Sequence, residues 1–175
     1  MLDSLAEALG PLPFVAEDLS VVSDAVAELR GRLKIPGMVV LQCAFDGAAG
    51  NNPHHPSNHR APALCWIGTH DTPTLAAWWA ELDQQSRGLV RESLSKRRLP
   101  IPPPGVAPIS QSIDLCLGSS AARSIVPVQG LLVLSPEGRM NTPGTNSGNW
   151  TWRLLEGQLQ EALEGVALGV VETTR

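Results

Sequence analysis

Residues 63–75, ALCWIGTHDTPTL, join a short apolar run to a polar turn and then to a second apolar stretch. The five residues at the start have the length and composition of a buried strand. The polar turn carries His70 and Asp71. Thr72 and Pro73 follow as an N-cap and a proline at the first helical position, which predicts the start of a helix. The stretch therefore predicts a unit of strand, polar turn and helix.

The same alternation extends in both directions from this unit. Further apolar runs of strand type lie at 12–16, at 38–43 and at 124–134, the last interrupted or ended near Pro127. Helical patterns lie at 22–34, 110–121 and 155–166. Ser23 is the predicted cap of the first of these helices, whose apolar stripe we expect to pack on the sheet. Strands that alternate with helices predict an α/β fold with parallel strands and right-handed crossovers.

Four predicted strands are half of an eight-stranded barrel, which typically needs about 250 residues. The chain has 175 residues, so we expect a partial barrel. The proline-rich stretch 100–108 is interpreted as a surface connection between helices and not as a domain boundary. Residues 1–175 are therefore predicted to form a single partial catalytic domain.

Composition excludes several classes of partner. Seventeen acidic and thirteen basic residues give a net charge of −4, which offers no basic field for nucleic acid. The longest apolar runs are too short to span a bilayer, so no membrane association is expected. The three cysteines are odd in number and include no CxxC pair. This argues against a disulfide framework and favours a cytoplasmic location.

Polar residues at the carboxyl ends of parallel strands are the usual working positions of such folds. This rule singles out Glu17-Asp18 and His70-Asp71. Carboxylates at neighbouring strand ends suit cleavage of a glycosidic bond, in which one carboxyl group protonates the leaving oxygen and another attacks or stabilises the sugar carbon. The structural alternative is that these acidic residues only cap the helices that follow.

Five segments, taken in their order along the chain, sharpen this choice. They are AEDL (16–19), GMVVLQCAFDG (37–47), NPHHPSNH (52–59), GTHDTPT (68–74) and RMNTPGTNSGNWTWR (139–153). Together they resemble the amylomaltase family of 4-alpha-glucanotransferases in the alpha-amylase superfamily, from about Pro13 to the last helix. The resemblance implies that the chain holds about strands 5–8, the C-terminal half, of a (β/α)8 TIM barrel.

The resemblance also implies roles for four residues. Glu17 matches the family's acid/base catalyst on the fifth strand, and Asp71 matches its transition-state-stabilising aspartate on the seventh. His70 and Asn141 match residues that contact the sugar substrate. A general acid must be protonated near neutral pH, which partial burial favours, so we expect Glu17 to be partly buried. Asp71 is expected to stay ionised.

The chain also departs from the family pattern. The family nucleophile is an aspartate in an RIDH-like segment on the fourth strand, and no such segment occurs here. Ser20 stands where the family usually has glycine, and Gly130 replaces an aspartate. The chain contains no tyrosine.

Three functional hypotheses follow. The first is a glucanotransferase that acts on maltooligosaccharides or alpha-1,4-glucans with retention, through a covalent intermediate and without a cofactor. The second is a catalytically incomplete fragment that binds glucan or a complementary N-terminal half of the barrel. The third is a metal-dependent hydrolase built on the histidine-rich loop. His54, His55 and His59 lie in a loop rich in glycine, asparagine and proline and not on a helix as in zinc hydrolases, and no carboxylate is regularly interleaved, so we expect no metal site.

Overall fold

The computed structural model describes residues 2–10, 13–19 and 23–164. Residues 158–164 form the last helix in these ranges. None of the described helices is long and apolar enough to cross a membrane. The other elements are α1 (Leu2–Leu9), α2 (Asp24–Arg32), β1 (Met38–Val40), η1 (Leu41–Cys43), β2 (Leu64–Trp66), α3 (Leu75–Glu81), α4 (Gln84–Lys96), α5 (Ile109–Leu117), β3 (Arg123–Ile125), α6 (Val128–Leu131) and η2 (Pro136–Gly138).

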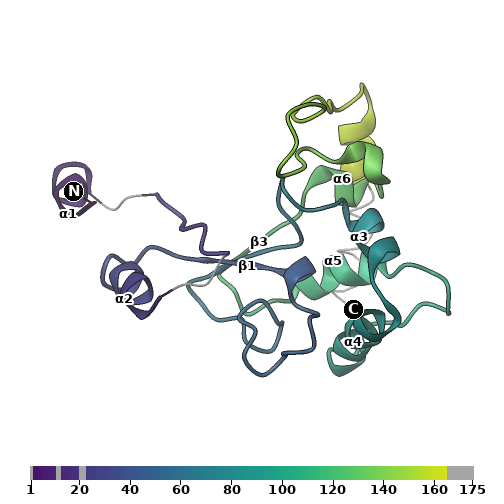
Figure 1. Cartoon of the computed structure of the whole chain (residues 1–175), viewed down its shortest axis with the longest axis horizontal. Helices are drawn as coiled ribbons and strands as arrows, with labels where there is room; N and C mark the ends of the chain where they lie inside the picture. Colours follow the sequence, from purple (N-terminus) through teal and green to yellow (C-terminus); the bar gives the residue numbers. More distant parts are fainter. Residues whose placement is uncertain (1, 11–12, 20–22, 165–175) are drawn as a thin grey trace.

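The strands form one parallel sheet in the order β1-β2-β3. Met38 pairs with Leu64, and Leu64 pairs in turn with Arg123. The connection from β2 to β3 contains α3, α4 and α5. Figure 1 shows these three helices at the same end of the molecule. The predicted α/β fold with parallel strands and flanking helices is confirmed.

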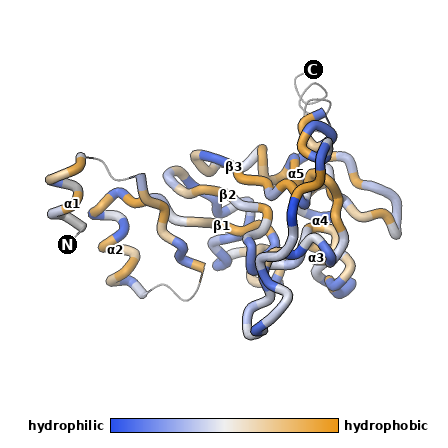
Figure 2. Tube along the Cα trace, turned by 90° about the horizontal axis from the view of Figure 1, so that it is seen from above, coloured by the Kyte–Doolittle hydropathy of each residue, from blue (hydrophilic) through white to orange (hydrophobic). Residues whose placement is uncertain are grey.

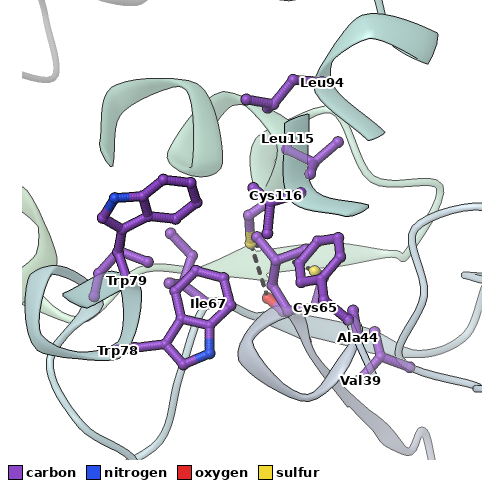
Figure 3. Close-up of a cluster of buried hydrophobic side chains, with 13 residues drawn as sticks. Val39, Ala44, Cys65, Ile67, Trp78, Trp79, Leu94, Leu115 and Cys116 are labelled. Carbon is purple, nitrogen blue, oxygen red and sulfur yellow. Dashed lines mark hydrogen bonds between the residues drawn. The ribbon is translucent and has the colours of Figure 1, made fainter. Parts of the chain in front are cut away.

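One face of the sheet packs on this helical layer. Successive side chains of a strand point to opposite faces, so Val39 and Cys65, which are register partners, share a face. Both are buried in a cluster with Trp78, Leu94 and other apolar side chains of α3, α4 and α5 (Figure 3). Burial of each large apolar side chain contributes about 1.5–3 kcal/mol. The core therefore lies between this face and α3–α5.

The opposite face of β2 is less covered. Leu64 and Trp66, which alternate with Cys65, are only half-buried. A parallel sheet in a complete α/β protein has both faces covered. The part of the chain that the structure describes covers one face and leaves the other partly open at β2, whereas Val40 on that second face of β1 is fully buried.

The strand predicted over 12–16 is wrong for residues 13–16, and residue 12 lies outside the described residues. This segment is extended without a strand assignment, and Phe14 and Val15 are 44% and 43% exposed. One backbone hydrogen bond, from Ala16 N to Pro36 O at 2.8 Å, joins it to the start of β1. Apolar runs of this kind need a covering layer on both sides, and the described residues supply none.

The helix predicted over 22–34 forms as α2, but its apolar stripe does not pack on the sheet. Val22 lies outside the described residues, and no residue of α2 is buried. Val26 and Leu29 are 50% and 42% exposed. Ser23 is the N-cap residue but its side chain makes no capping hydrogen bond. Figures 1 and 2 place α1 and α2 at the opposite end of the molecule from α3, α4 and α5.

The predictions for the second half are closer to the structure. β3 ends before Pro127, as predicted, and the apolar residues after it form α6 instead of more strand. The helix predicted over 110–121 is α5, which ends earlier, at Leu117. The last helix predicted over 155–166 begins at residue 158, and its final two residues lie outside the described ranges.

The proline-rich stretch 100–108 connects α4 to α5, as predicted. Arg91 of α4 holds it, because its guanidinium donates hydrogen bonds to Pro102 O at 2.7 Å and to Pro103 O at 3.3 Å. The same guanidinium lies 5.7 Å from the centre of the Trp79 ring. The connection is therefore fixed to the helical layer by one side chain.

Candidate active site

The polar turn after β2 is held together by its own threonines. Thr69 N donates to Thr72 Oγ1 at 3.0 Å, and that hydroxyl donates back to Thr69 O at 3.1 Å. Asp71 N donates to Thr69 Oγ1 at 3.2 Å. The N-cap of α3 is Thr74, which accepts from Ala77 N at 3.3 Å, and not Thr72 as predicted. The Thr72 hydroxyl is already used inside the turn.

Gln42, directly after β1, holds both ends of this turn. Its backbone N–H donates to Ile67 O at 3.0 Å, and its side-chain Nε2 donates to Pro73 O at 3.0 Å. The backbone carbonyl oxygen of Gln42 accepts a hydrogen bond from Trp78 Nε1 at 3.1 Å. The turn is therefore clamped between β1 and α3. We did not single out Gln42 from the sequence, although a polar residue at the end of an apolar run is a usable signal.

The turn meets residues from the 139–153 segment. Asn141 Nδ2 donates to Asp71 Oδ1 at 2.5 Å, and His70 Nε2 lies 3.3 Å from the same oxygen. Asn141 N also donates to His70 O at 3.0 Å. Three of the four predicted site residues are therefore in direct contact, although Asn141 lies 70 positions from Asp71 in the sequence.

Two further residues of the 139–153 segment contact His70, Asp71 and Asn141. The Arg139 guanidinium donates to Asp71 O and to Asn141 O, both at 2.8 Å, and so ties the two loops together. The ring of Trp150 lies 5.1 Å from the His70 ring, with a tilt of 36°. Trp150 is 52% exposed, so one side of it faces solvent. Sequence reasoning missed Arg139 as a site residue, although it opens the RMN motif.

The site is open to solvent on one side and has a cavity beneath it. The side chains of His70 and Asp71 are 45% and 40% exposed. A cavity of about 260 Å³ lies next to them, and its walls include Trp66, Gln42 and Arg139. Trp66 Nε1 and Gln42 Oε1 are buried and find no hydrogen-bond partner among the described residues.

Glu17 lies apart from these residues. Its neighbours Ala16 and Asp18 bond to the start of β1, since Asp18 Oδ1 accepts from Met38 N at 2.7 Å. His70 and Asp71 instead follow the end of β2. Glu17 is exposed, so the expected partial burial is wrong. The half-buried acidic residue of this segment is Asp18, which forms an ion pair with Arg30 at 3.2 Å.

The histidine-rich loop is held by hydrogen bonds within the protein. His54 Nδ1 accepts from Val40 N at 3.1 Å. His59 Nε2 lies 2.8 Å from His54 O, which can only accept, so Nε2 carries the proton and Nδ1 faces Ser119 Oγ at 2.8 Å. His55 Nδ1 contacts Ser57 Oγ at 2.7 Å. In residues 2–10, 13–19 and 23–164 we find no group of three side chains that could hold a metal ion.

His54 makes the stability of the fold depend on pH. Burial lowers the pKa of its imidazole, and this effect is opposed by the charges of Asp18 and Asp46 and reinforced by His59. As pH falls below the unfolded value of about 6.5, the unfolded chain takes up this proton first. The stability that neutral His54 contributes is therefore present above that pH and is lost as pH falls toward the folded pKa.

We expect a His54→Asn variant to lose less stability on acidification than the wild type. Asparagine offers an oxygen that accepts from Val40 N but carries no titrating group. The measurement is the free energy of unfolding in urea at about pH 7.5 and about pH 5.5, on either side of the imidazole pKa. His55, whose pKa is also lowered by burial, supplies the remaining dependence. Equal losses in the two proteins would show that His54 is not responsible.

Comparison with known proteins identifies the family of this chain. A family model described as 4-alpha-glucanotransferase matches residues 1–159. The chain is 40% identical over 155 residues to the chloroplastic/amyloplastic 4-alpha-glucanotransferase of Arabidopsis thaliana, with coverage of 88% of this chain and 26% of that protein. It is 36% identical over 161 residues to the 4-alpha-glucanotransferase of Thermus thermophilus, with coverage of 91% and 32%.

Among solved structures, the amylomaltase from Streptococcus agalactiae in complex with acarbose is similar, with a TM-score of 0.82 and 25% identity. The match covers 97% of this chain and 34% of that one. The chain therefore spans about a quarter to a third of the length of these relatives. The extent of the family match, together with these identities, establishes that the chain belongs to the 4-alpha-glucanotransferase family, the amylomaltases.

Proposed function

We propose that this chain supplies part of the active site of a 4-alpha-glucanotransferase that acts on maltooligosaccharides and alpha-1,4-glucans with retention. The observation that carries the proposal is the Asp71 carboxylate, held by Asn141 and beside His70 on a clamped turn. Pre-positioned charges and dipoles stabilise a transition state because they need no rearrangement when charge develops. Because the chain belongs to the 4-alpha-glucanotransferase family, we interpret this geometry as part of a site for glucan transfer.

In this proposal the Asp71 carboxylate balances the positive charge that develops on the sugar in an oxocarbenium-like transition state. His70 and Asn141 donate hydrogen bonds to sugar hydroxyls. The exposed ring of Trp150, which lies against His70, offers an apolar face on which a sugar ring can stack. Arg139 keeps the two loops in register through its bonds to Asp71 O and Asn141 O.

Glu17 is proposed as the acid/base catalyst. It must be covered for this role, because a carboxyl group in water is ionised at neutral pH. The loose attachment of its segment, through Ala16 and Asp18 alone among the described contacts, leaves room for Glu17 to be covered by additional protein. The nucleophile must come from outside this chain, since no RIDH-like segment is present.

We further propose that residues 1–175 form one partial catalytic domain, the C-terminal half of a (β/α)8 barrel at about strands 5–8, which packs against an N-terminal half. Two features support this. Leu64 and Trp66 on one face of β2 are only half-buried, and Phe14 and Val15 are exposed. The second hypothesis, a catalytically incomplete fragment, describes the same chain on its own. A cytoplasmic location remains part of the proposal.

A chimera tests both parts of the proposal. The portion of the Thermus thermophilus relative that precedes its match to this chain is joined to residues 1–175, and maltotriose is supplied as substrate. We expect glucose and longer maltooligosaccharides from the chimera and none from the 175-residue chain alone. The intact Thermus protein serves as the positive control. A folded chimera without products would contradict the proposed function, and turnover by the isolated chain would contradict the proposed need for an N-terminal half.

A further inference from the structure

Two cysteines from distant parts of the sequence meet in the core. Cys65 lies in the middle of β2 and Cys116 in the last turn of α5, 51 positions away. Their Sγ atoms are 3.4 Å apart, and both residues are fully buried. Figure 3 shows the two side chains beside each other between the sheet and the helical layer. No part of the proposed transfer reaction uses this pair.

Neighbouring groups hold the pair in place and make its members unequal. Ser124 Oγ donates to Cys116 O at 2.7 Å, and the Cys116 thiol faces Cys65 O at 3.7 Å. A hydrogen bond with the Cys116 thiol, and a weaker one with His59, lower the pKa of Cys65 against the opposing effect of burial. The same hydrogen bond and burial raise the pKa of Cys116.

We propose that Cys65 and Cys116 form a redox modification site, at which hydrogen peroxide or another small hydroperoxide converts the two thiols into an internal disulfide. A disulfide needs the sulfurs about 2.05 Å apart, so the pair at 3.4 Å has only a small distance to close. This inference does not depend on the glucanotransferase activity.

The chemistry balances with one peroxide molecule. The Cys65 thiolate attacks one peroxide oxygen, the O–O bond breaks, and water leaves after protonation, so that Cys65 carries a sulfenic acid. The Cys116 sulfur then attacks the Cys65 sulfur. The S–S bond forms, the S–O bond breaks, and a second water leaves with the proton of Cys116. Peroxide gains two electrons and the two cysteines lose two.

Access to the buried pair requires a local opening in which α5, the helix that carries Cys116, moves away from β2. Local openings can cost less free energy than unfolding of the whole domain. A small uncharged oxidant is therefore the class that fits, whereas a bulky disulfide such as oxidised glutathione does not.

The test uses the full chain with Cys43, the one exposed cysteine of the three, replaced by serine. The Cys43→Ser protein is treated with millimolar hydrogen peroxide under native conditions and, separately, in urea. We expect the native protein to lose both free thiols and the mass of two hydrogen atoms, to show a cross-link between the tryptic peptides that contain Cys65 and Cys116, and to melt at a higher temperature. Dithiothreitol should restore both thiols and the original Tm.

Two matched variants in the Cys43→Ser background each lack one of the two sulfurs. With Cys116→Ala and with Cys65→Ala we expect no internal disulfide and no rise in Tm after peroxide treatment. The proposal is overturned if the native Cys43→Ser protein keeps both thiols, cross-links only between molecules, or forms the disulfide only in urea. This result stands on its own, even where an alanine variant fails to fold.

Discussion

A Trp78→Ala variant is expected to unfold with a free energy about 3–5 kcal/mol lower than the wild type. Trp78 is 7% exposed and belongs to the core between the sheet and α3–α5. The centre of its ring lies 6.0 Å from the centre of the Phe45 ring. Its removal leaves a cavity and an unpartnered Gln42 carbonyl. Because small domains are stable by only about 5–15 kcal/mol, this is a large share of the total. Urea denaturation followed by circular dichroism measures the change.

Two controls assign the loss to its causes. Trp78→Phe keeps a ring in the core but removes the N–H that bonds Gln42 O, so we expect a loss of about 1–3 kcal/mol. Trp150→Ala makes the same change in size at a ring that is 52% exposed, and we expect an effect of about 0.5 kcal/mol. If Trp78→Ala and Trp150→Ala cost the same, the assignment of Trp78 to the core is wrong.

The sequence correctly predicted those parts of the fold that are determined by residues close together along the chain. The unit at 63–75 formed as expected because an apolar run, a turn and a capped helix are each specified within a few residues. Even there the cap was misplaced by two positions. Thr72 and Thr74 have the same side chain, and only the hydrogen bond from Thr72 back to Thr69 shows which of them closes the turn.

The parts that were wrong are apolar patterns that the described residues leave uncovered. The run at 12–16 and the stripe of α2 have the composition of buried elements, yet Phe14 and Val26 are exposed. A hydrophobic pattern indicates that a face is suited to burial, but it does not indicate which part of the protein covers that face. In the proposed half-barrel, such patterns mark the faces that an N-terminal half would cover.

The candidate site shows a related limit. His70 and Asp71 were located by the rule for strand ends, whereas Asn141 came only from the resemblance, since no local pattern connects it to a residue 70 positions away. Gln42 and Arg139 were missed because their side chains bond to backbone carbonyl groups of other loops. Any residue offers such a carbonyl, so sequence alone gives little sign of the pairing.

The largest effect on activity is expected from Asp71→Asn in the chimera with the Thermus thermophilus portion. Asparagine has nearly the shape of aspartate, and its side-chain oxygen can still accept the hydrogen bond from Asn141. The substitution therefore removes the negative charge and leaves the loop contacts in place. Loss of one pre-positioned electrostatic group typically lowers kcat by about 10²–10³-fold, and we expect a decrease of this size in the transfer of glucosyl units from maltotriose.

Asp83→Asn is the matched control for this variant. Asp83 is exposed and caps α4 through a bond from Ser86 N at 2.7 Å, a role that asparagine fills equally well. We expect the Asp83→Asn chimera to keep its kcat and both chimeras to unfold at the same urea concentration. Equal stability with a lower kcat in Asp71→Asn alone would assign the loss to charge in the transition state. A chimera that keeps full activity after Asp71→Asn would remove Asp71 from the proposed mechanism, because no other described carboxylate lies on this turn.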